Sequence, residues 1–293
     1  MLSDPVNEAS GPQFPSPAVA PVLGLLLAAH PAPAGAVTAL ITALAAASGR
    51  DTHGCLLVAL AVLTGQLSVG WSNDRIDLRR DLAAERGDKP LVTGAVRART
   101  VEAAAGCALL LCVPLSLANG LLAGTAHLIG VAAAWSYNLG VKATLFSWLP
   151  YALAFGLLPA FVTLGLPGRP WPPSWLMAAG ALLGVGAHFT NVLPDIDTDL
   201  AAGIRGLPQR LGRQRSRSAA ALALVAASVL LVLGPPGPPG SAGWAGLAVT
   251  GVLALATALP LGADVRSRLP FLTTLGLAAV DVALLLLRGS SLA

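Results

Sequence analysis

Long apolar runs, separated by short charged or turn-rich connections, dominate this sequence. A helix needs about 20 apolar residues to cross a bilayer, with about 17 to 25 as the working range. Nine segments approach that length, at residues 34–49, 54–72, 98–117, 121–138, 144–166, 174–193, 216–234, 243–262 and 270–288. The expected fold class is therefore an all-α membrane protein with nine transmembrane helices.

The composition excludes an ordinary soluble domain. Of the 293 residues, 55% are hydrophobic and 11% are charged, whereas a soluble domain has about 25% charged residues. The net charge of +4 does not indicate nucleic-acid binding, because the basic residues cluster in short connections and form no amphipathic or aromatic-rich stripe. The three cysteines lie inside apolar runs without metal or disulfide spacing, which favours small buried side chains.

The first 33 residues differ from the rest of the chain. They lack the positively charged start of a signal peptide and are interrupted by seven prolines. We expect residues 1–33 to be a loose or amphipathic lead-in, in which 19–29 is long enough for a half-helix. Residues 34–293 are then a single polytopic domain.

Basic residues indicate the membrane orientation, because cytoplasmic loops are enriched in Lys and Arg. With nine spans, the connections after spans two, four, six and eight share one side and carry fifteen of the eighteen basic residues. The other side keeps Arg50, Arg169 and Arg288. This split predicts a multi-pass protein of the cell membrane with a cytosolic amino terminus.

Two acidic motifs with one spacing follow the second and sixth apolar runs. The first consists of Asn73, Asp77 and Asp81, and the second of Asn191, Asp195 and Asp199. Because a helical turn takes about 3.6 residues, side chains four residues apart lie on one helix face. Both motifs fall on the predicted cytosolic side.

So many carboxylates near a membrane repel one another and are costly to desolvate, and a divalent cation removes both penalties. Asp and Asn oxygens are hard ligands, and sites with one or two carboxylates plus substrate phosphates are typical of Mg²⁺. Arg75, Lys89 and Arg205 lie near enough in sequence to bind phosphate oxygens. The alternative is a solvated helix end whose acids pair with Arg79, Arg80 and Arg205.

These residues resemble the UbiA superfamily of intramembrane prenyltransferases, which has an Asn-Asp-x-x-Asp-x-x-x-Asp first motif and an Asp-x-x-x-Asp second motif. Both patterns are complete here. The segment 88–94 is similar to the family's Arg-Pro-Leu-x-x-Gly loop, with Lys89 at the basic position. The segment 137–142 is similar to its Tyr-x-x-x-x-Lys pattern. The resemblance covers about residues 30 to 290.

The resemblance implies nine helices around a central cavity with a cytosolic cap and a lateral opening for lipid substrates. It assigns magnesium and diphosphate to Asn73, Asp77, Asp81, Asp195 and Asp199, to which the matching spacing adds Asn191. Lys142 and Arg205 would contact the diphosphate, and Tyr137 would face the developing allylic cation. Asp77, Asp195, Lys142 and Tyr137 are thus the expected catalytic residues. An interfacial role for Tyr137 and a topogenic role for Lys142 remain open.

The function implied is magnesium-dependent transfer of a prenyl group from a prenyl diphosphate to an aromatic, lipid or other nucleophilic acceptor within the membrane. A membrane-bound terpene cyclase of the same superfamily would use the same metal motifs. A transporter is the alternative from another class, but it needs polar residues at the bilayer centre, and these acids lie at span ends.

Overall fold

A computed structural model of the chain describes residues 19–258, 276, 277, 279, 280 and 283, and their regular elements are all helical. Eight predicted spans coincide with helices, and most of the ninth, 270–288, lies outside the described residues. The elements are α1 (Val19–Ala28), α2 (Pro31–Ala47), α3 (Thr52–Ala83), α4 (Ala98–Leu117), α5 (Leu121–Leu139), η1 (Val141–Ala143), α6 (Leu149–Thr163), α7 (Ser174–Val192), η2 (Leu193–Asp195), α8 (Ile196–Ala201), α9 (Leu207–Leu211), α10 (Arg213–Leu233) and α11 (Gly240–Ala258).

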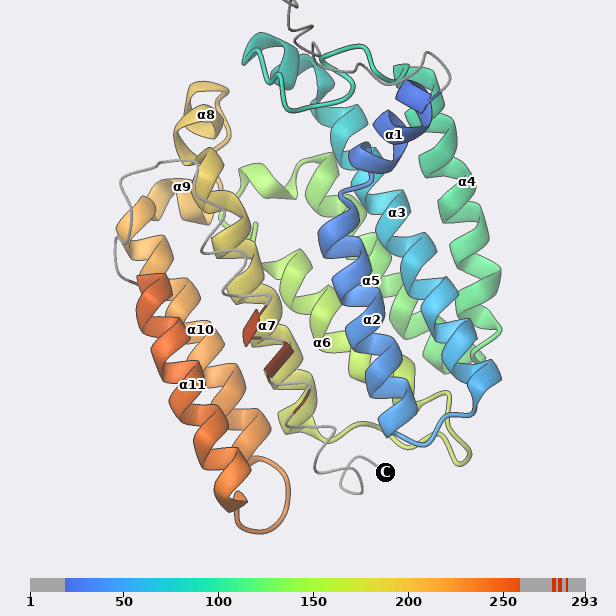
Figure 1. Cartoon of the computed structure of the whole chain (residues 1–293), viewed down its shortest axis with the longest axis vertical. Coiled ribbons are helices and arrows are strands. Elements are labelled where there is room, and N and C mark those ends of the chain that lie inside the picture. The colour runs from blue at the N-terminus through green and yellow to red at the C-terminus, as the bar shows by residue number, and fades with distance from the viewer. Residues whose placement is uncertain (1–18, 259–275, 278, 281–282, 284–293) are drawn as a thin grey trace, which may run out of the picture.

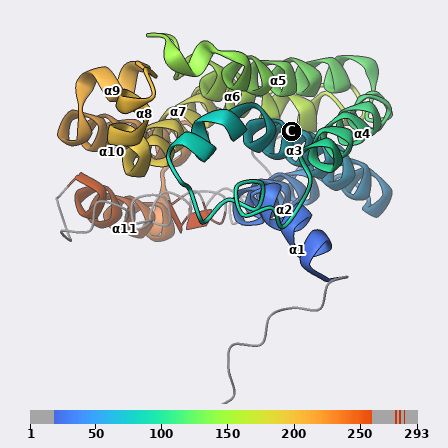
Figure 2. The same cartoon turned by 90° about the horizontal axis from the view of Figure 1, so that it is seen from above.

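The long helices run side by side along the molecule (Figure 1). Helices that follow one another in the chain are mostly neighbours in space, with extensive contacts between α3 and α4, α5 and α6, α6 and α7, and α10 and α11. From above, α2 and α11 lie on one side of the bundle and α5 and α6 on the other (Figure 2). A core of buried side chains that includes Val58, Val62, Phe161 and Leu176 joins α3, α6 and α7.

Four described helices are long and apolar enough to cross a membrane, namely 52–83, 98–117, 174–201 and 213–233. The number rises to five if α1 and α2, which are bent by 58°, form one broken span. Helices α6 and α11 are apolar but shorter. The nine-span count therefore remains a prediction.

The predicted half-helix at 19–29 corresponds to α1, which packs against α3 and α4. The indole Nε1 of Trp71 donates to the Leu25 carbonyl over 2.9 Å. A Cβ at Gly70 would lie 2.5 Å from the carbonyl oxygen of Ala29, so α3 needs a glycine there. The chain then turns at His30, whose φ of 54° is left-handed. The domain boundary at residue 34 stays a prediction.

Polar connections gather at one end of the bundle (Figure 1). The loop that joins α3 to α4 lies at this end, and so do the short helices α8 and α9. At the opposite end, Arg50 ties three connections together: Nη1 donates to Asn119 Oδ1 over 2.6 Å and Nη2 to the Gly165 carbonyl over 2.8 Å. Charge-assisted hydrogen bonds of this kind are stronger than neutral ones. The distribution of basic residues predicts that Arg50 and Arg169 share this side.

Small residues let α6 and α7 approach closely. A Cβ at Gly184 would lie 2.4 Å from the Tyr151 carbonyl oxygen, and one at Gly180 would lie 2.7 Å from that of Phe155. A side chain of any size at either position forces the helices apart. These glycines therefore serve helix packing, and Gly180 also lines a cavity between the helices.

Gly184→Ala is expected to lower the stability of the protein by about 1–3 kcal/mol, the usual cost of overpacking. The matched control is Gly106→Ala on α4, where an added Cβ meets nothing within 4 Å. The measurement is thermal unfolding of both purified variants in the same detergent. Equal midpoints for the two variants would contradict the close packing of α6 and α7.

Candidate active site

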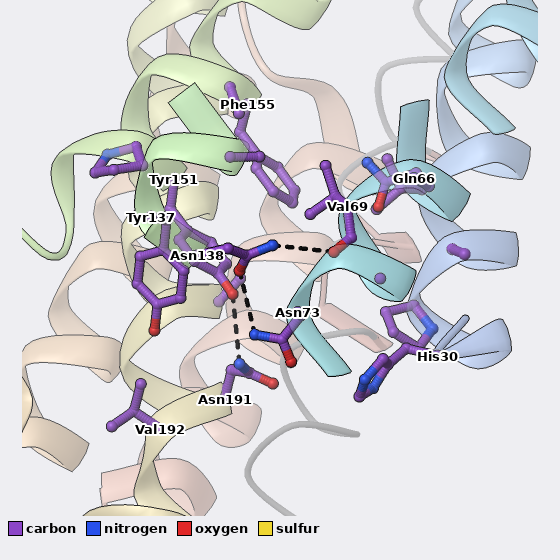
Figure 3. A pocket seen from close by; sticks show the side chains of 18 of the residues that line it. His30, Gln66, Val69, Asn73, Tyr137, Asn138, Tyr151, Phe155, Asn191 and Val192 are labelled. Atoms are coloured by element: carbon purple, nitrogen blue, oxygen red, sulfur yellow. Dashed lines mark hydrogen bonds between the residues drawn. The ribbon is translucent and has the colours of Figure 1, made fainter. Parts of the chain in front are cut away.

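A cavity of about 380 Å³ lies between α2, α3, α5, α6 and α7, and it extends from the polar end of the bundle into its apolar interior. Figure 3 shows Asn73, Asn138 and Asn191 converging there, with Tyr137 and Tyr151 on one side. The charged lining residues gather at the end near the α3–α4 loop, and the remaining lining is mostly apolar. The cavity can therefore hold an amphipathic ligand.

Only part of the first acidic motif lines the cavity. Asn73 and Asp77 line the cavity, and Asn73 Nδ2 donates to Asp77 Oδ2 over 3.2 Å. Asn73 Nδ2 also donates to Asn138 Oδ1 over 3.1 Å, which ties α3 to α5. Asp81 is on the same helix face but is 3% exposed and is not a lining residue. Asp74, one turn before Asp77, is buried and is not a lining residue.

The second motif extends over a break in the helix. Helix α7 ends at Val192, and the chain continues through a 3₁₀ turn into α8. Pro194 lies in that turn, where it has no N–H to continue the α-helical pattern. Asn191, Asp195 and Asp199 nevertheless all line the cavity, so the predicted motif faces the first one across it.

Arg80 links the two motifs. Its Nη2 donates to Asp77 Oδ2 over 2.9 Å, and its Nη1 to Asp199 Oδ1 over 3.3 Å. Asp81 Oδ1 lies 3.5 Å from the same Nη2. The other oxygen of Asp199 accepts from Gln209 Nε2 over 2.8 Å. The ion pairing with Arg80 that the sequence offered as an alternative is thus present, and it places acids of both motifs around one cation.

A second cation, Arg86, reaches the cavity from the α3–α4 loop. Its Nη1 donates to Asp195 Oδ1 over 2.9 Å. Its Nε and Nη2 bind the two oxygens of Asp88 at 2.9 and 3.0 Å. Hydrogen bonding to Arg86 lowers the pKa of Asp88 to about 2. Asp88 is therefore charged at neutral pH and holds the guanidinium in orientation.

Both predicted lysines line the cavity. Lys142, in the 3₁₀ turn after α5, donates to Asp77 Oδ1. Lys89 donates to Asp74 Oδ1 over 2.6 Å, and the same oxygen is 2.7 Å from His30 Nε2. The buried Asp74 thus anchors the loop lysine and the turn between α1 and α2.

Two predicted basic residues lie elsewhere. Arg75 points to the exposed surface of α3 and α4, where its Nε donates to Glu102 Oε2 over 3.0 Å. Arg205 is exposed. Neither is among the described lining residues of the cavity, because proximity in sequence does not fix the direction of a side chain.

Aromatic side chains form the wall beside the charged end. Tyr137 and Tyr151 line the cavity, and their rings meet edge to face at 5.2 Å between centroids. His188 lies behind both rings, is 1% exposed and binds Ser147 Oγ through Nε2 at 3.1 Å. It is a hydrogen-bonded interior histidine and is not a lining residue.

The lining includes several polar residues that the sequence analysis did not propose as ligands of metal or substrate. They are Arg80, Arg86, Asn138, Tyr151 and Gln209. The position of Arg80, one helical turn after Asp77, indicates in the sequence that it can lie near the cavity. Arg86, Asn138 and Gln209 lie in or beside connections whose course the sequence does not predict.

The donor set fits a magnesium ion that binds together with a phosphorylated substrate. Among the described residues, no three Asp, Glu, His or Cys side chains converge on one point as a closed metal site. Magnesium commonly uses one or two carboxylates, several waters and substrate phosphates. Asn73, Asp77, Asn191, Asp195 and Asp199 offer hard oxygen donors around the charged end. Lys142, Lys89, Arg80 and Arg86 offer the cations that phosphate oxygens require.

Solved structures with the same fold cover most of the chain. The apo structure of a UbiA homolog from Aeropyrum pernix K1 is 19% identical, with a TM-score of 0.67 over 87% of this chain and 96% of that chain. A UbiA homolog from Archaeoglobus fulgidus bound to GPP and Mg²⁺ is 17% identical, with a TM-score of 0.64 over 89% and 99%. A structure of digeranylgeranylglyceryl phosphate synthase is 15% identical, with a TM-score of 0.64 over 92% and 98%.

No curated protein sequence matches the chain. The model of the UbiA prenyltransferase family matches residues 34–280, which is most of its length. The apolar helices agree with that match. The chain is therefore an integral membrane protein that belongs to the UbiA prenyltransferase family.

Proposed function

We propose that this protein catalyses magnesium-dependent transfer of a prenyl group from a prenyl diphosphate to an aromatic or other nucleophilic acceptor within the membrane. The observation that carries the proposal is the cavity itself, which joins a charged end to an apolar interior. The shape matches a prenyl diphosphate, whose charged head and hydrocarbon chain need opposite surroundings. A related fold binds GPP and Mg²⁺ in the Archaeoglobus fulgidus homolog.

The two motifs would hold the metal and the diphosphate jointly. Asn73, Asp77, Asn191, Asp195 and Asp199 are the proposed magnesium ligands. Asp81 is buried behind them and is proposed to orient Arg80. When bound, magnesium supplies positive charge that stabilises the departing diphosphate.

The lysines and arginines would bind the diphosphate oxygens. Lys142, Arg80 and Arg86 now bind carboxylates that line the cavity, and Lys89 binds the buried Asp74. A bound diphosphate offers them a stronger anion, so we propose that they exchange carboxylate oxygens for phosphate oxygens. Charge-assisted contacts with a leaving group act where negative charge develops. We leave Arg75 and Arg205 out of the site because neither lines the cavity.

The bond that breaks joins the first prenyl carbon to the diphosphate oxygen, which keeps the electron pair. The acceptor's electron pair forms the new bond to that carbon, and the acceptor then loses a proton. Tyr137 and Tyr151 present rings beside the charged end. We propose that they exclude water and stabilise positive charge on the prenyl carbon, because aromatic rings attract cations.

The test of the reaction class is product analysis. Purified protein, magnesium and a labelled prenyl diphosphate are incubated with and without a mixture of hydroxylated aromatic acids. We expect label in a prenylated acceptor, and only when acceptor is present. Label converted to a cyclic hydrocarbon without acceptor would identify a terpene cyclase and refute transfer.

We further propose nine membrane spans, with the amino terminus and both acidic motifs on the cytosolic side of the cell membrane. This topology rests on the distribution of the basic residues. Reporter fusions near Arg86 and Arg215 are expected to report cytosol, and a fusion near Pro238 to report the outside. All three fusions on one side would contradict the topology.

A further inference from the structure

Two unbroken stripes of lining residues run from the charged end of the cavity into its apolar part. On α2 the stripe extends from His30 to Leu44, and on α7 it extends from Asn191 to Leu176. In both helices the lining positions recur at steps of three or four residues, so one helix face follows the cavity throughout. From His30 toward Leu44, and from Asn191 toward Leu176, the remaining lining residues of both stripes are apolar.

The stripes give the depth of the cavity. His30 and Leu44 are fourteen residues apart, which corresponds to about 21 Å at the helical rise of 1.5 Å per residue. Asn191 and Leu176 are fifteen residues apart, which corresponds to about 22 Å. Helices from the two halves of the chain thus give the same depth.

Four leucines lie at the apolar end of the cavity. Leu44 of α2, Leu158 of α6, Leu176 of α7 and Leu231 of α10 all line the cavity, and each is at most 8% exposed. Leu44, Leu176 and Leu231 belong to the core that includes the fully buried Phe161. We call these four leucines the leucine floor.

We infer that the leucine floor limits the length of the prenyl chain, and that the donor is an allylic diphosphate of three or four isoprene units. An isoprene unit adds four carbons to the main chain and about 5 Å to its extended length, from C–C bonds of about 1.5 Å. Four units then reach the floor. The inference rests on the proposed function and adds the size class of its donor.

A longer chain meets a physical obstacle at the floor. Each carbon that enters the apolar stripes leaves water, which favours binding until the cavity is filled. A further unit must displace leucines that are packed into the core, and close-packed interiors resist such insertion. Affinity should therefore rise with chain length and then fall.

The experiment compares allylic diphosphates of 10, 15, 20, 25, 30 and 45 carbons with the full-length protein in detergent. Turnover is measured with the acceptor found above, and binding is measured as the ligand-induced rise in unfolding temperature. We expect kcat/KM and the thermal shift to peak at 15 or 20 carbons. At 30 carbons we expect kcat/KM to fall by at least about tenfold, within the range that a closed apolar pocket can discriminate.

Two variants move the limit in opposite directions. Leu176→Ala deepens the floor and is expected to raise the activity with a 25-carbon donor relative to the 20-carbon donor. Val37→Phe narrows the cavity beside α2, about 10 Å from His30 toward the leucine floor. We expect this variant to lose activity with the 20-carbon donor and to keep activity with the 10-carbon donor. The control is Leu110→Ala on α4, whose side chain is exposed and distant from the cavity lining. It should leave the length profile unchanged.

The outcomes separate the inference from the function. Transfer or binding that is equal for 20 and 45 carbons, or a profile that neither Leu176→Ala nor Val37→Phe shifts, overturns the leucine floor while the proposed function stands. Binding that peaks at 15 or 20 carbons without transfer to any acceptor supports the floor and refutes the proposed reaction. If Leu176→Ala does not fold, the chain-length profile of Val37→Phe alone tests the leucine floor.

Discussion

Asp195→Asn is expected to lower the turnover of a prenyl diphosphate by at least about 10²-fold, the usual loss when one group of a preorganised electrostatic site is removed. Asparagine keeps the size of the side chain and a carbonyl oxygen that Arg86 can bind, but it loses the charge. Asp195 lines the charged end of the cavity. Steady-state rates at saturating magnesium measure the effect.

The matched control lies two residues away. Asp197 pairs with Arg213 at 2.7 Å, its side chain is 72% exposed, and it does not line the cavity. Asp197→Asn should therefore keep turnover within about twofold of the parent. Similar losses in Asp195→Asn and Asp197→Asn would show that charge at the helix end matters and that the cavity face does not.

Because Asp77 faces Asp195 from the other motif, the two are expected to act as one unit. The double variant Asp77→Asn/Asp195→Asn should be about as inactive as either single variant, as found for groups that work jointly. Losses that multiply would indicate two independent sites.

Lys142→Gln is expected to lower kcat by at least about 10²-fold, because it removes a cation from the end of the cavity where the diphosphate leaves. Glutamine retains donors but not the charge. Lys142 now contacts Asp77, so the same substitution leaves that carboxylate with Arg80 and Asn73 as its partners. The drop is expected in kcat more than in KM, since negative charge grows as the bond breaks.

Arg75→Gln is the control for Lys142→Gln. The sequence favoured both residues, but Arg75 binds Glu102 on the exposed surface. An exposed ion pair of this kind contributes little, so activity should change by less than about twofold. A large loss in Arg75→Gln, or full activity in Lys142→Gln, would contradict the placement of these side chains.

Much of the helical fold could be predicted from the sequence, because a membrane span must be a long apolar run. The runs at 98–117 and 121–138 match α4 and α5 within one residue at each end. The predicted half-helix at 19–29 ends close to the break between α1 and α2, but the left-handed conformation of His30 at that break was not predicted. The second motif's 3₁₀ turn at Pro194 was also missed, although proline was a signal for it.

The site was predictable where helical spacing decides direction. Asn73 and Asp77 share one face of α3 and line the cavity together, whereas Asp81, on the same face, lies beyond it. Arg86 and Gln209 come from segments whose course depends on tertiary contacts. Their partners, Asp195 and Asp199, were predicted from the second motif. Helical periodicity, however, does not predict which residues from other segments will bind these carboxylates.

Both motifs are expected to bind one magnesium–prenyl diphosphate unit jointly. The most direct test is calorimetric binding of an uncleavable prenyl thiodiphosphate to the purified full-length protein, with magnesium and with a chelator. We predict binding that requires magnesium and that is lost in both Asp77→Asn and Asp195→Asn but kept in Asp197→Asn. Equal affinity with and without magnesium, or binding that survives in Asp77→Asn and Asp195→Asn, would contradict the account.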